Sequence, residues 1–359
     1  MPAAMSSPDI RKILVRGTNW LGDAVMTIPA LEQLRASFPQ TQITLLAPPR
    51  AAEVFSGFPH VDEVVPYLRK EKGRQAFLDA MRFLRNERYD LAILFQNAFE
   101  AALLAFLGGV KVRIGYDTQG RGALLTHKLQ RLEAHRNRHQ THDYLDVVAE
   151  AERVCLDREV VTTRQNIPSL IANRKQIQAA DALLRRAQID SQSQQLIALN
   201  VGATNSRAKC WPEDRFAALA DRLVAELNAR IVLIGAGSER ADAEHVIAQM
   251  KHKNAATNLA GETSIAELIG LLARCDLVVT NDTGPAHVAA ALNKPTLTIF
   301  GPTNEFETAP LGTHSALIRV DDIDCARCMH RDCPIDHRCM TRLHVDAVAT
   351  KAFSLLEEL

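Results

Sequence analysis

Residues 275–302 read CDLVVTNDTGPAHVAAALNKPTLTIFGP, and this stretch decides the fold. Two apolar runs, at 276–280 and 295–300, flank a polar turn and a short helical stretch that begins near Gly284. Short apolar runs bounded by turn residues are typical of strands that are buried on both faces. The stretch therefore predicts strand, helix and strand in succession, which is the βαβ unit of a parallel sheet.

The turn before this helix carries Asp282, Thr283 and Pro285. Asp282 or Thr283 suits the helix N-cap, and Pro285 suits the first turn, where its missing N–H leaves nothing unsatisfied. A helix N-terminus also presents free backbone N–H groups and a partial positive charge, which attract phosphate. The motif by itself fits a plain helix cap as well as a phosphate site, so the choice depends on the rest of the chain.

Length and composition limit what the protein is. With 359 residues the chain exceeds one ordinary core and is predicted to form two domains. Its 42 basic and 42 acidic residues cancel, so we expect no nucleic acid as a partner. Residues 1–10 lack the basic head and apolar core of a signal peptide, and we therefore expect a cytoplasmic protein with reduced thiols.

The first half of the chain begins with an apolar strand at 12–16, a glycine-containing loop at 17–23 and an amphipathic helix at 24–37. Further strands at 42–47, 63–67 and 90–95 alternate with helical stretches, which predicts a parallel sheet covered by helices. Loops at the carboxyl ends of such strands line the ligand crevice, so Asp23 at the exit of its loop is a candidate catalytic residue. A plain N-cap is the alternative role for Asp23, and the two roles are compatible.

The second half repeats this layout after a polar linker at 165–173. A strand at 196–201 leads through a small-residue loop at 202–212 into a helix at 213–227, and further strands and helices follow. We therefore expect two similarly built α/β domains that face each other across a central cleft.

Two residues of the second half are candidates for binding a nucleotide. Lys209, in the loop ahead of a helix, is suited to neutralise a diphosphate, although a solvated lysine is the alternative. The strand and turn at 231–240 are similar to a dinucleotide fingerprint, but Arg240 stands where the third glycine is required, so we do not expect a nicotinamide cofactor. Glu239 remains as a candidate acceptor for ribose hydroxyls.

Two further segments leave their interpretation open. Residues 111–142 hold seven Lys or Arg and four His against two acidic residues, which fits either a solvated loop or an anionic partner. Near the end of the chain four cysteines lie within fifteen residues, with His330 and His337 among them. Their spacing is not that of a zinc ribbon, so an ordered loop of free thiols is favoured over a metal site, and no metal ligand is predicted. The four are Cys325, Cys328, Cys333 and Cys339.

Taken together, these motifs resemble the ADP-heptose:lipopolysaccharide heptosyltransferases. The resemblance rests on residues 16–23 (RGTNWLGD), on 202–213 with Lys209, on 281–287, on 300–303, and on the cysteine cluster. The motifs follow one another in the expected order over nearly the whole chain. Within the family, the sequence NWLGD and the four cysteines favour the enzymes that add the second heptose.

The resemblance implies a fold and a reaction. The fold is α/β of the GT-B type, with two Rossmann-like parallel-sheet domains facing a central cleft. The acceptor-binding domain is residues 1–170, the donor-binding domain is 171–342, and a helix at 343–359 packs back toward the first domain. The reaction is transfer of L-glycero-D-manno-heptose from ADP-heptose to the first heptose of the inner core, with inversion at the anomeric carbon.

The resemblance also implies partners and site residues. The acceptor is heptosyl-Kdo2-lipid A at the inner leaflet, where the basic segment makes a weak peripheral membrane contact, and no metal cofactor is required. Asp23 is the general base and Lys209 holds the diphosphate. The donor is bound by Thr204, Lys209, Glu239, Asp282, Thr283, Gly284 and His287, and the acceptor by Asn19, Arg136 and Arg138.

Three alternatives stay open at this point. The chain is a family member that adds the first heptose, or a GT-B transferase that uses another nucleotide sugar. Alternatively, it is a non-catalytic two-domain protein that binds a small anionic or sugar ligand.

Overall fold

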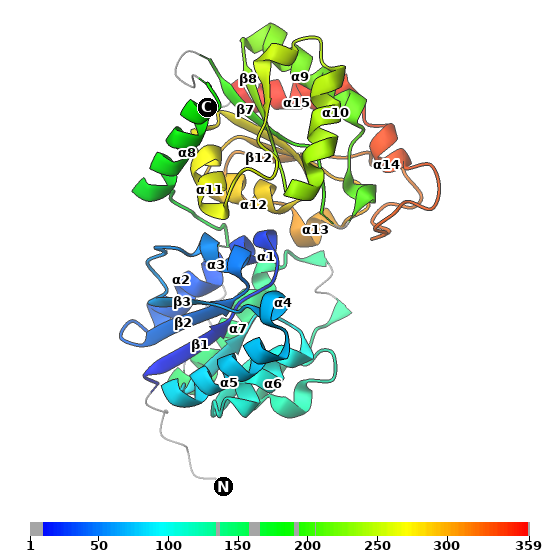
Figure 1. The fold of residues 1–359 in the computed structure, drawn as a ribbon. Helices are drawn as coiled ribbons and strands as arrows, with labels where there is room; N and C mark the ends of the chain where they lie inside the picture. The colour runs from blue at the N-terminus through cyan, green and yellow to red at the C-terminus, as the bar shows by residue number, and fades with distance from the viewer. Residues whose placement is uncertain (1–9, 134–136, 158–165, 190–193, 205, 358–359) are drawn as a thin grey trace. The chain divides into compact units, whose positions relative to one another are not determined.

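The computed structural model describes residues 10–133, 137–157, 166–189, 194–204 and 206–357. The chain divides into two compact units, Met1–Pro168 and Ser169–Leu359, each built around a six-stranded parallel sheet (Figure 1). The division falls inside the linker that was predicted from composition, two residues before the expected boundary.

In the first unit the strand order is β3-β2-β1-β4-β5-β6. The core on one face packs Leu14, Leu46, Ala92 and Leu94 of the strands against α5 and α6, while α2 packs against α7. The strands are β1 (Lys12–Arg16), β2 (Gln42–Ala47), β3 (Glu63–Pro66), β4 (Leu91–Leu94), β5 (Val112–Tyr116) and β6 (His127–Leu129). The helices are α1 (Leu21–Met26), α2 (Ile28–Ser37), α3 (Pro49–Val54), α4 (Arg69–Lys72), α5 (Arg74–Glu87), α6 (Phe99–Leu107), the 3-10 turn η1 (Gly122–Leu124) and α7 (Thr141–Leu156).

The single helix predicted at 24–37 is two helices, α1 and α2. Pro29 has no backbone N–H to donate to the carbonyl four residues earlier, so the first helix ends and a second begins with Thr27 as its N-cap. The first helix also begins earlier than expected, at Leu21, which places Asp23 within its first turn.

In the second unit the strand order is β12-β11-β10-β7-β8-β9. The predicted βαβ unit is confirmed as β10, α12 and β11, and Val278 pairs with Thr296 in parallel register. The strands are β7 (Leu196–Asn200), β8 (Arg230–Ile234), β9 (Ala256–Asn258), β10 (Leu277–Asn281), β11 (Thr296–Ile299) and β12 (Ser315–Ile318). The helices are α8 (Arg174–Arg186), α9 (Glu213–Leu227), α10 (Arg240–Gln249), α11 (Ile265–Arg274), α12 (Gly284–Ala291), α13 (Glu305–Thr308), α14 (Arg338–Thr341) and α15 (Val345–Glu357), with 3-10 turns η3 (Arg207–Lys209), η4 (Gly237–Glu239) and η5 (Lys253–Ala255).

The last helix, α15, lies in the core of the second unit. That it packs back toward the N-terminal domain was expected from the sequence and stays a prediction. Its apolar residues Val348, Ala352 and Leu355 recur on one face and are buried with α9 and the sheet strands. Figure 1 shows α15, in red, beside α9. Among the described helices, none is long and apolar enough to cross a bilayer.

Candidate functional site

The loops that follow β7, β10 and β11 meet at the carboxyl edge of the second sheet, because these strands are neighbours in it. The side chain of Lys209 comes from the first loop, Asp282 from the second and Thr303 from the third. Lys209 Nζ lies 2.8 Å from Asp282 Oδ2 and donates to the backbone carbonyl of Asp282 at 3.2 Å. Thr303 Oγ1 donates to the same Asp282 Oδ2 at 2.8 Å. The structure therefore brings together two of the predicted donor-binding residues.

The ion pair is largely shielded from water. The side chain of Asp282 is 5% exposed and that of Lys209 is 26% exposed. A carboxylate this deeply buried needs a charged partner and hydrogen bonds, and Lys209 and Thr303 supply them. Lys209 is therefore the more exposed partner of the pair.

Asn281, which sequence reasoning missed, fixes the loop that carries Lys209. Its Nδ2 donates to the carbonyls of Val201 at 2.7 Å and Gly202 at 3.3 Å, and its Oδ1 accepts from the backbone N–H of Trp211 at 3.0 Å. One buried amide thus ties the end of β10 to both ends of the loop 201–211. The only signal in the sequence is an amide side chain at the end of an apolar run, directly before Asp282.

Glu239 and Thr204, both predicted to bind the donor, are also brought together. Glu239 Oε1 accepts from Thr204 Oγ1 at 3.0 Å, and Oε2 accepts from the backbone N–H of Ala236 at 2.8 Å. The carboxylate lies against the backbone of Gly202 and Gly235. A Cβ added at Gly202 would lie 2.4 Å from Glu239 Cδ, and a Cβ added at Gly235 would lie 2.6 Å from Glu239 Oε2. The two glycines are therefore required for the position of this carboxylate.

Helix α12 begins beside the Lys209–Asp282 pair. Thr283 is its N-cap, and the side chain of Thr283 makes no capping hydrogen bond to the helix. Thr283 Oγ1 is instead directed to the strand, at 3.1 Å from Thr280 Oγ1 and 3.3 Å from the carbonyl of Asn281. His287 follows in the helix and is buried. Binding of an anion at the first turn, from Gly284 onward, stays a prediction.

Asp23 lies in the first unit, in the first turn of α1. The N-cap of that helix is Trp20, so the alternative interpretation of Asp23 as the N-cap is wrong. Burial first, and then the negative charge of Asp23, raise the pKa of Tyr144 well above its usual value. The half-buried carboxylate of Asp23 is therefore near the buried phenol of Tyr144 on α7.

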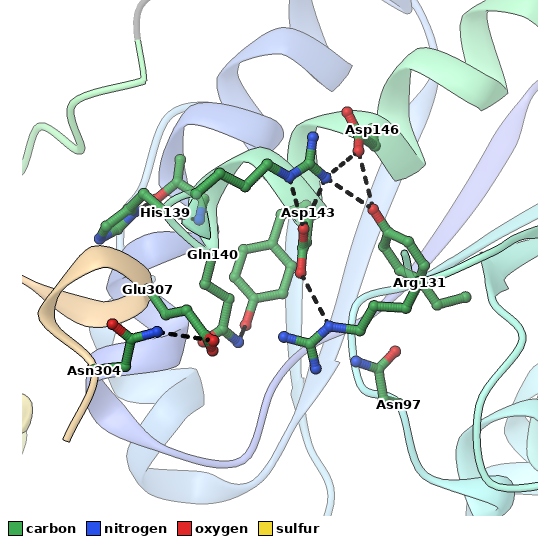
Figure 2. Close-up of polar contacts among 12 residues, drawn as sticks. Asn97, Arg131, His139, Gln140, Asp143, Asp146, Asn304 and Glu307 are labelled. Atoms are coloured by element: carbon green, nitrogen blue, oxygen red, sulfur yellow. Dashed lines mark hydrogen bonds and ion pairs between the residues drawn. The ribbon is translucent and has the colours of Figure 1, made fainter. Parts of the chain in front are cut away.

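Arg138, predicted to bind the acceptor, is occupied by two carboxylates of α7. Its Nη2 lies 2.7 Å from Asp143 Oδ1 and also pairs with Asp146, which accepts from the hydroxyl of Tyr116 at 3.0 Å. Figure 2 shows these two aspartates with their partners, including Arg131, whose Nε lies 3.7 Å from Asp143 Oδ2. The charge of Arg138 is thus neutralised within the first unit, and its contact with an acceptor stays a prediction.

Two other cations of the basic segment, Arg121 and Lys128, also have partners within the first unit. Arg121 is fully buried and donates to the carbonyls of Tyr116 and Gln96 and to Asn97 Oδ1, so it ties the loop after β4 to the loop after β5. Lys128 pairs with Asp117 at 3.2 Å. Arg136 lies outside the described residues. Asn19, the remaining predicted acceptor contact, is exposed in the loop between β1 and α1.

The four late cysteines gather in space. Burial first, and then interaction with the thiols of Cys333, Cys328 and Cys325, raise the pKa of Cys339 to about 11. All four are free thiols of intermediate exposure. In the part of the chain that the structure describes, no group of three or more His, Cys, Asp or Glu residues is arranged to hold a metal ion.

The amino-acid sequence of this chain is similar to those of enzymes that transfer sugars. The sequence profile described as Glycosyltransferase family 9 (heptosyltransferase) matches residues 78–338. Lipopolysaccharide heptosyltransferase 2 of Escherichia coli strain K12 is 31% identical over 317 residues, which cover 86% of this chain and 88% of that protein.

Solved structures agree with the sequence comparison. The structure of E. coli ADP-heptose lps heptosyltransferase II superimposes with a TM-score of 0.79 at 27% identity, and covers 97% of this chain and 99% of that one. The crystal structure of the glycosyl transferase family 9 protein from Veillonella parvula DSM 2008 gives a TM-score of 0.85 at 21% identity, with 99% and 100% covered, which shows likeness of fold. The α/β, GT-B architecture expected from the sequence is confirmed.

Proposed function

The chain belongs to glycosyltransferase family 9, the heptosyltransferases, and from that premise we propose that it catalyses the heptosyltransferase II reaction. In this reaction L-glycero-D-manno-heptose passes from ADP-heptose to the first heptose of the lipopolysaccharide inner core. The observation that carries the proposal is the ammonium of Lys209, held by Asp282 beside the start of α12, in a chain 31% identical to a lipopolysaccharide heptosyltransferase 2. The protein is a glycosyltransferase, and the identity of donor and acceptor is what we propose.

We assign the donor to the carboxyl edge of the second unit. Lys209 and the N–H groups at the start of α12 would bind the diphosphate, with Thr283 and Gly284 at that helix start. Negative charge grows on the diphosphate as ADP departs, and positive groups fixed in advance stabilise that state more than the ground state. Thr204 and Glu239 would meet the ribose hydroxyls, and His287 would complete the donor site.

The proposed chemistry is a single displacement with inversion. Asp23 accepts the proton of the acceptor hydroxyl while the hydroxyl oxygen forms its bond to the anomeric carbon. The bond from that carbon to the β-phosphate oxygen breaks, and ADP leaves with the electron pair. Lys209 and the helix dipole supply the charge that a divalent ion supplies in other transferases, so we propose that no metal is required.

We propose heptosyl-Kdo2-lipid A, at the cytoplasmic face of the inner membrane, as the acceptor. Asn19 is exposed four residues before Asp23 and is a candidate contact for it. The pairing of Arg138 with Asp143 and Asp146 supports a structural role for that arginine. A weak peripheral membrane contact and a cytoplasmic location are part of this proposal.

Mass spectrometry tests the reaction directly. The protein is incubated with ADP-heptose and heptosyl-Kdo2-lipid A, and we expect the acceptor to gain the mass of one heptose. Asp23→Asn removes the base without changing its size, so turnover should fall by about 10²–10⁴-fold. ADP should still raise the melting temperature of this variant, because the proposed ADP contacts lie in the second unit.

Two results would redirect the assignment. Near-normal turnover by the Asp23→Asn variant would exclude Asp23 as the base. Stabilisation of the wild-type protein by UDP but not by ADP would favour another nucleotide sugar as the donor.

A further inference from the structure

The segment 325–339, here called the cysteine segment, has no role in the proposed reaction, yet it packs against the loop that carries Lys209. Its contact is with Ala208, the residue directly before the lysine, which is buried. The backbone N–H of Ala208 donates to the carbonyl of Arg331 at 2.9 Å. The carbonyl of Ala208 lies 2.7 Å from Nε2 of His337. Both backbone groups of Ala208 are therefore bound by the cysteine segment.

The bond from His337 acts on Lys209 through the peptide plane. A carbonyl oxygen is an acceptor only, so Nε2 of His337 carries the proton and donates it. The carbonyl of Ala208 and the backbone N of Lys209 belong to one planar peptide unit, and fixing the first fixes the second. The other end of the lysine is held by Asp282, which Nζ contacts at 2.8 Å. Lys209 is thus restrained at its backbone and at its ammonium.

The backbone of His337 is itself in an unusual conformation. Its φ is +56°, in the left-handed region that glycine and asparagine adopt most readily. Its N–H donates to Sγ of Cys333 at 3.2 Å, and it is the N-cap of α14. A histidine in this conformation is held there by the hydrogen bonds of its backbone N–H to Cys333 and of its ring to Ala208.

The cysteine segment also touches the loop on the other side of Asp282. Met329 donates its N–H to the carbonyl of Pro302 at 2.9 Å. A Cβ on Gly301 would lie 3.3 Å from Sγ of Cys339, so the loop after β11 and the cysteine segment are in close contact there. This loop continues to Thr303, whose hydroxyl holds the carboxylate of Asp282 at 2.8 Å. One segment therefore supports both Lys209 and the group that pairs with it.

We infer that His337 is a positioning residue that fixes Lys209 for the diphosphate of the donor. It reaches the lysine through the carbonyl of Ala208, and it contacts no reacting atom in this assignment. The inference rests on the proposed role of Lys209. It gives a function to His337, which has no role of its own in the proposed reaction.

The informative variant is His337→Asn. Asparagine suits a positive φ better than histidine does, so backbone strain is relieved, but its shorter side chain does not reach Ala208. We expect the melting temperature to stay the same or rise, while the Kd for ADP and the KM for ADP-heptose rise about tenfold. A role limited to folding would instead move stability and affinity in the same direction.

Two controls separate position from chemistry. His337→Gln keeps an N–H donor of similar reach and should restore ADP affinity to within about threefold of wild type. His330→Asn makes the same substitution at an exposed histidine of the same segment and should leave Kd and KM unchanged. In a Lys209→Met background, His337→Asn should weaken ADP binding no further, because no ammonium remains to be positioned.

The measurement does not depend on turnover. ADP binding by calorimetry tests the positioning role even if the acceptor proves to be a different glycolipid and no heptose is transferred. A His337→Asn variant with wild-type ADP affinity would overturn the inference. So would a full additional loss of affinity when the substitution is combined with Lys209→Met.

Discussion

Lys209 and Asp282 are a buried ion pair, and each residue depends on the other. In a Lys209→Met variant the transition state loses its cation, so kcat/KM for ADP-heptose should fall by about 10²–10³-fold. The carboxylate of Asp282, 5% exposed, then lacks its charged partner, which should lower the free energy of unfolding by about 1–3 kcal/mol. Transfer kinetics and urea denaturation measure the two effects separately.

The double variant Lys209→Met with Asp282→Asn is the matched control. Replacing the stranded carboxylate by an amide removes a buried charge, so the double variant should unfold at higher urea than Lys209→Met alone. Its activity should remain low. Equal stability of the single and double variants would mean that the pair is solvated in solution and contributes little to folding.

Cys155 and Cys275 are buried thiols, and they make stability depend on pH. Burial raises the pKa of Cys155 from 9.0 to about 11 and that of Cys275 to about 12. Between pH 9 and 11 the unfolded chain therefore loses protons that the folded chain keeps, so the free energy of unfolding falls as pH rises above about 9 and is unaffected by these groups below it. The melting temperature of a variant with both cysteines changed to alanine should fall less steeply with pH in that range. Parallel curves for variant and wild type would contradict this.

The turns after β7 and β8 depend on glycine because Glu239 occupies the space beside them. A Cβ on Gly202 would lie 2.4 Å from Cδ of Glu239, so Gly202→Ala should displace the carboxylate and raise the KM for ADP-heptose about tenfold or more. At Gly237 the nearest atom to an added Cβ is 3.9 Å away, so Gly237→Ala should leave the KM within about twofold. An equal response of the two variants in donor titrations would show that Glu239 does not bind the donor.

Elements were predicted where the signal is local. The βαβ unit at 275–302 follows from apolar runs and a capping turn, and its strands and helix lie where the sequence indicated. The break of the helix at 24–37 was missed, although Pro29 was visible, because the long apolar periodicity outweighed it. Asn281 could not be assigned a role, because its partners Val201 and Trp211 are 70 to 80 residues away in sequence.

Charged segments were the least predictable part of the site. A run of cations has the same composition whether it faces solvent, an acceptor or the protein itself. Arg121 and Arg138 are paired within the protein, because Asn97 meets the first and Asp143 and Asp146 meet the second from other elements. Only the fold decides which carboxylate or carbonyl meets which guanidinium, so these pairings could not be predicted from composition.

At the scale of the whole molecule, the second unit has a complete core of its own. Two domains were foreseeable because strand, glycine loop and helix begin both halves of the chain. The place of α15 was not, since an apolar helix face specifies burial but not the surface that buries it. In the structure Val348, Ala352 and Leu355 are buried in the same hydrophobic core as residues of α9 and of the strands of this unit.

This closed core predicts that residues 169–359 fold by themselves and bind ADP. They contain every residue assigned to the donor, so ADP at a hundredfold excess over its Kd should stabilise the fragment by about 2.7 kcal/mol and raise its melting temperature by about 5–10 °C. Heptose transfer should be absent, because Asp23 lies in the other unit. A fragment ending at residue 343 loses α15, exposes the apolar surface that Val348, Ala352 and Leu355 cover in the intact unit, and should fail to unfold cooperatively. If 169–359 also lacks a cooperative transition, the second unit depends on the first for its stability, and the assignment of α15 as the closing element of an independent core is wrong.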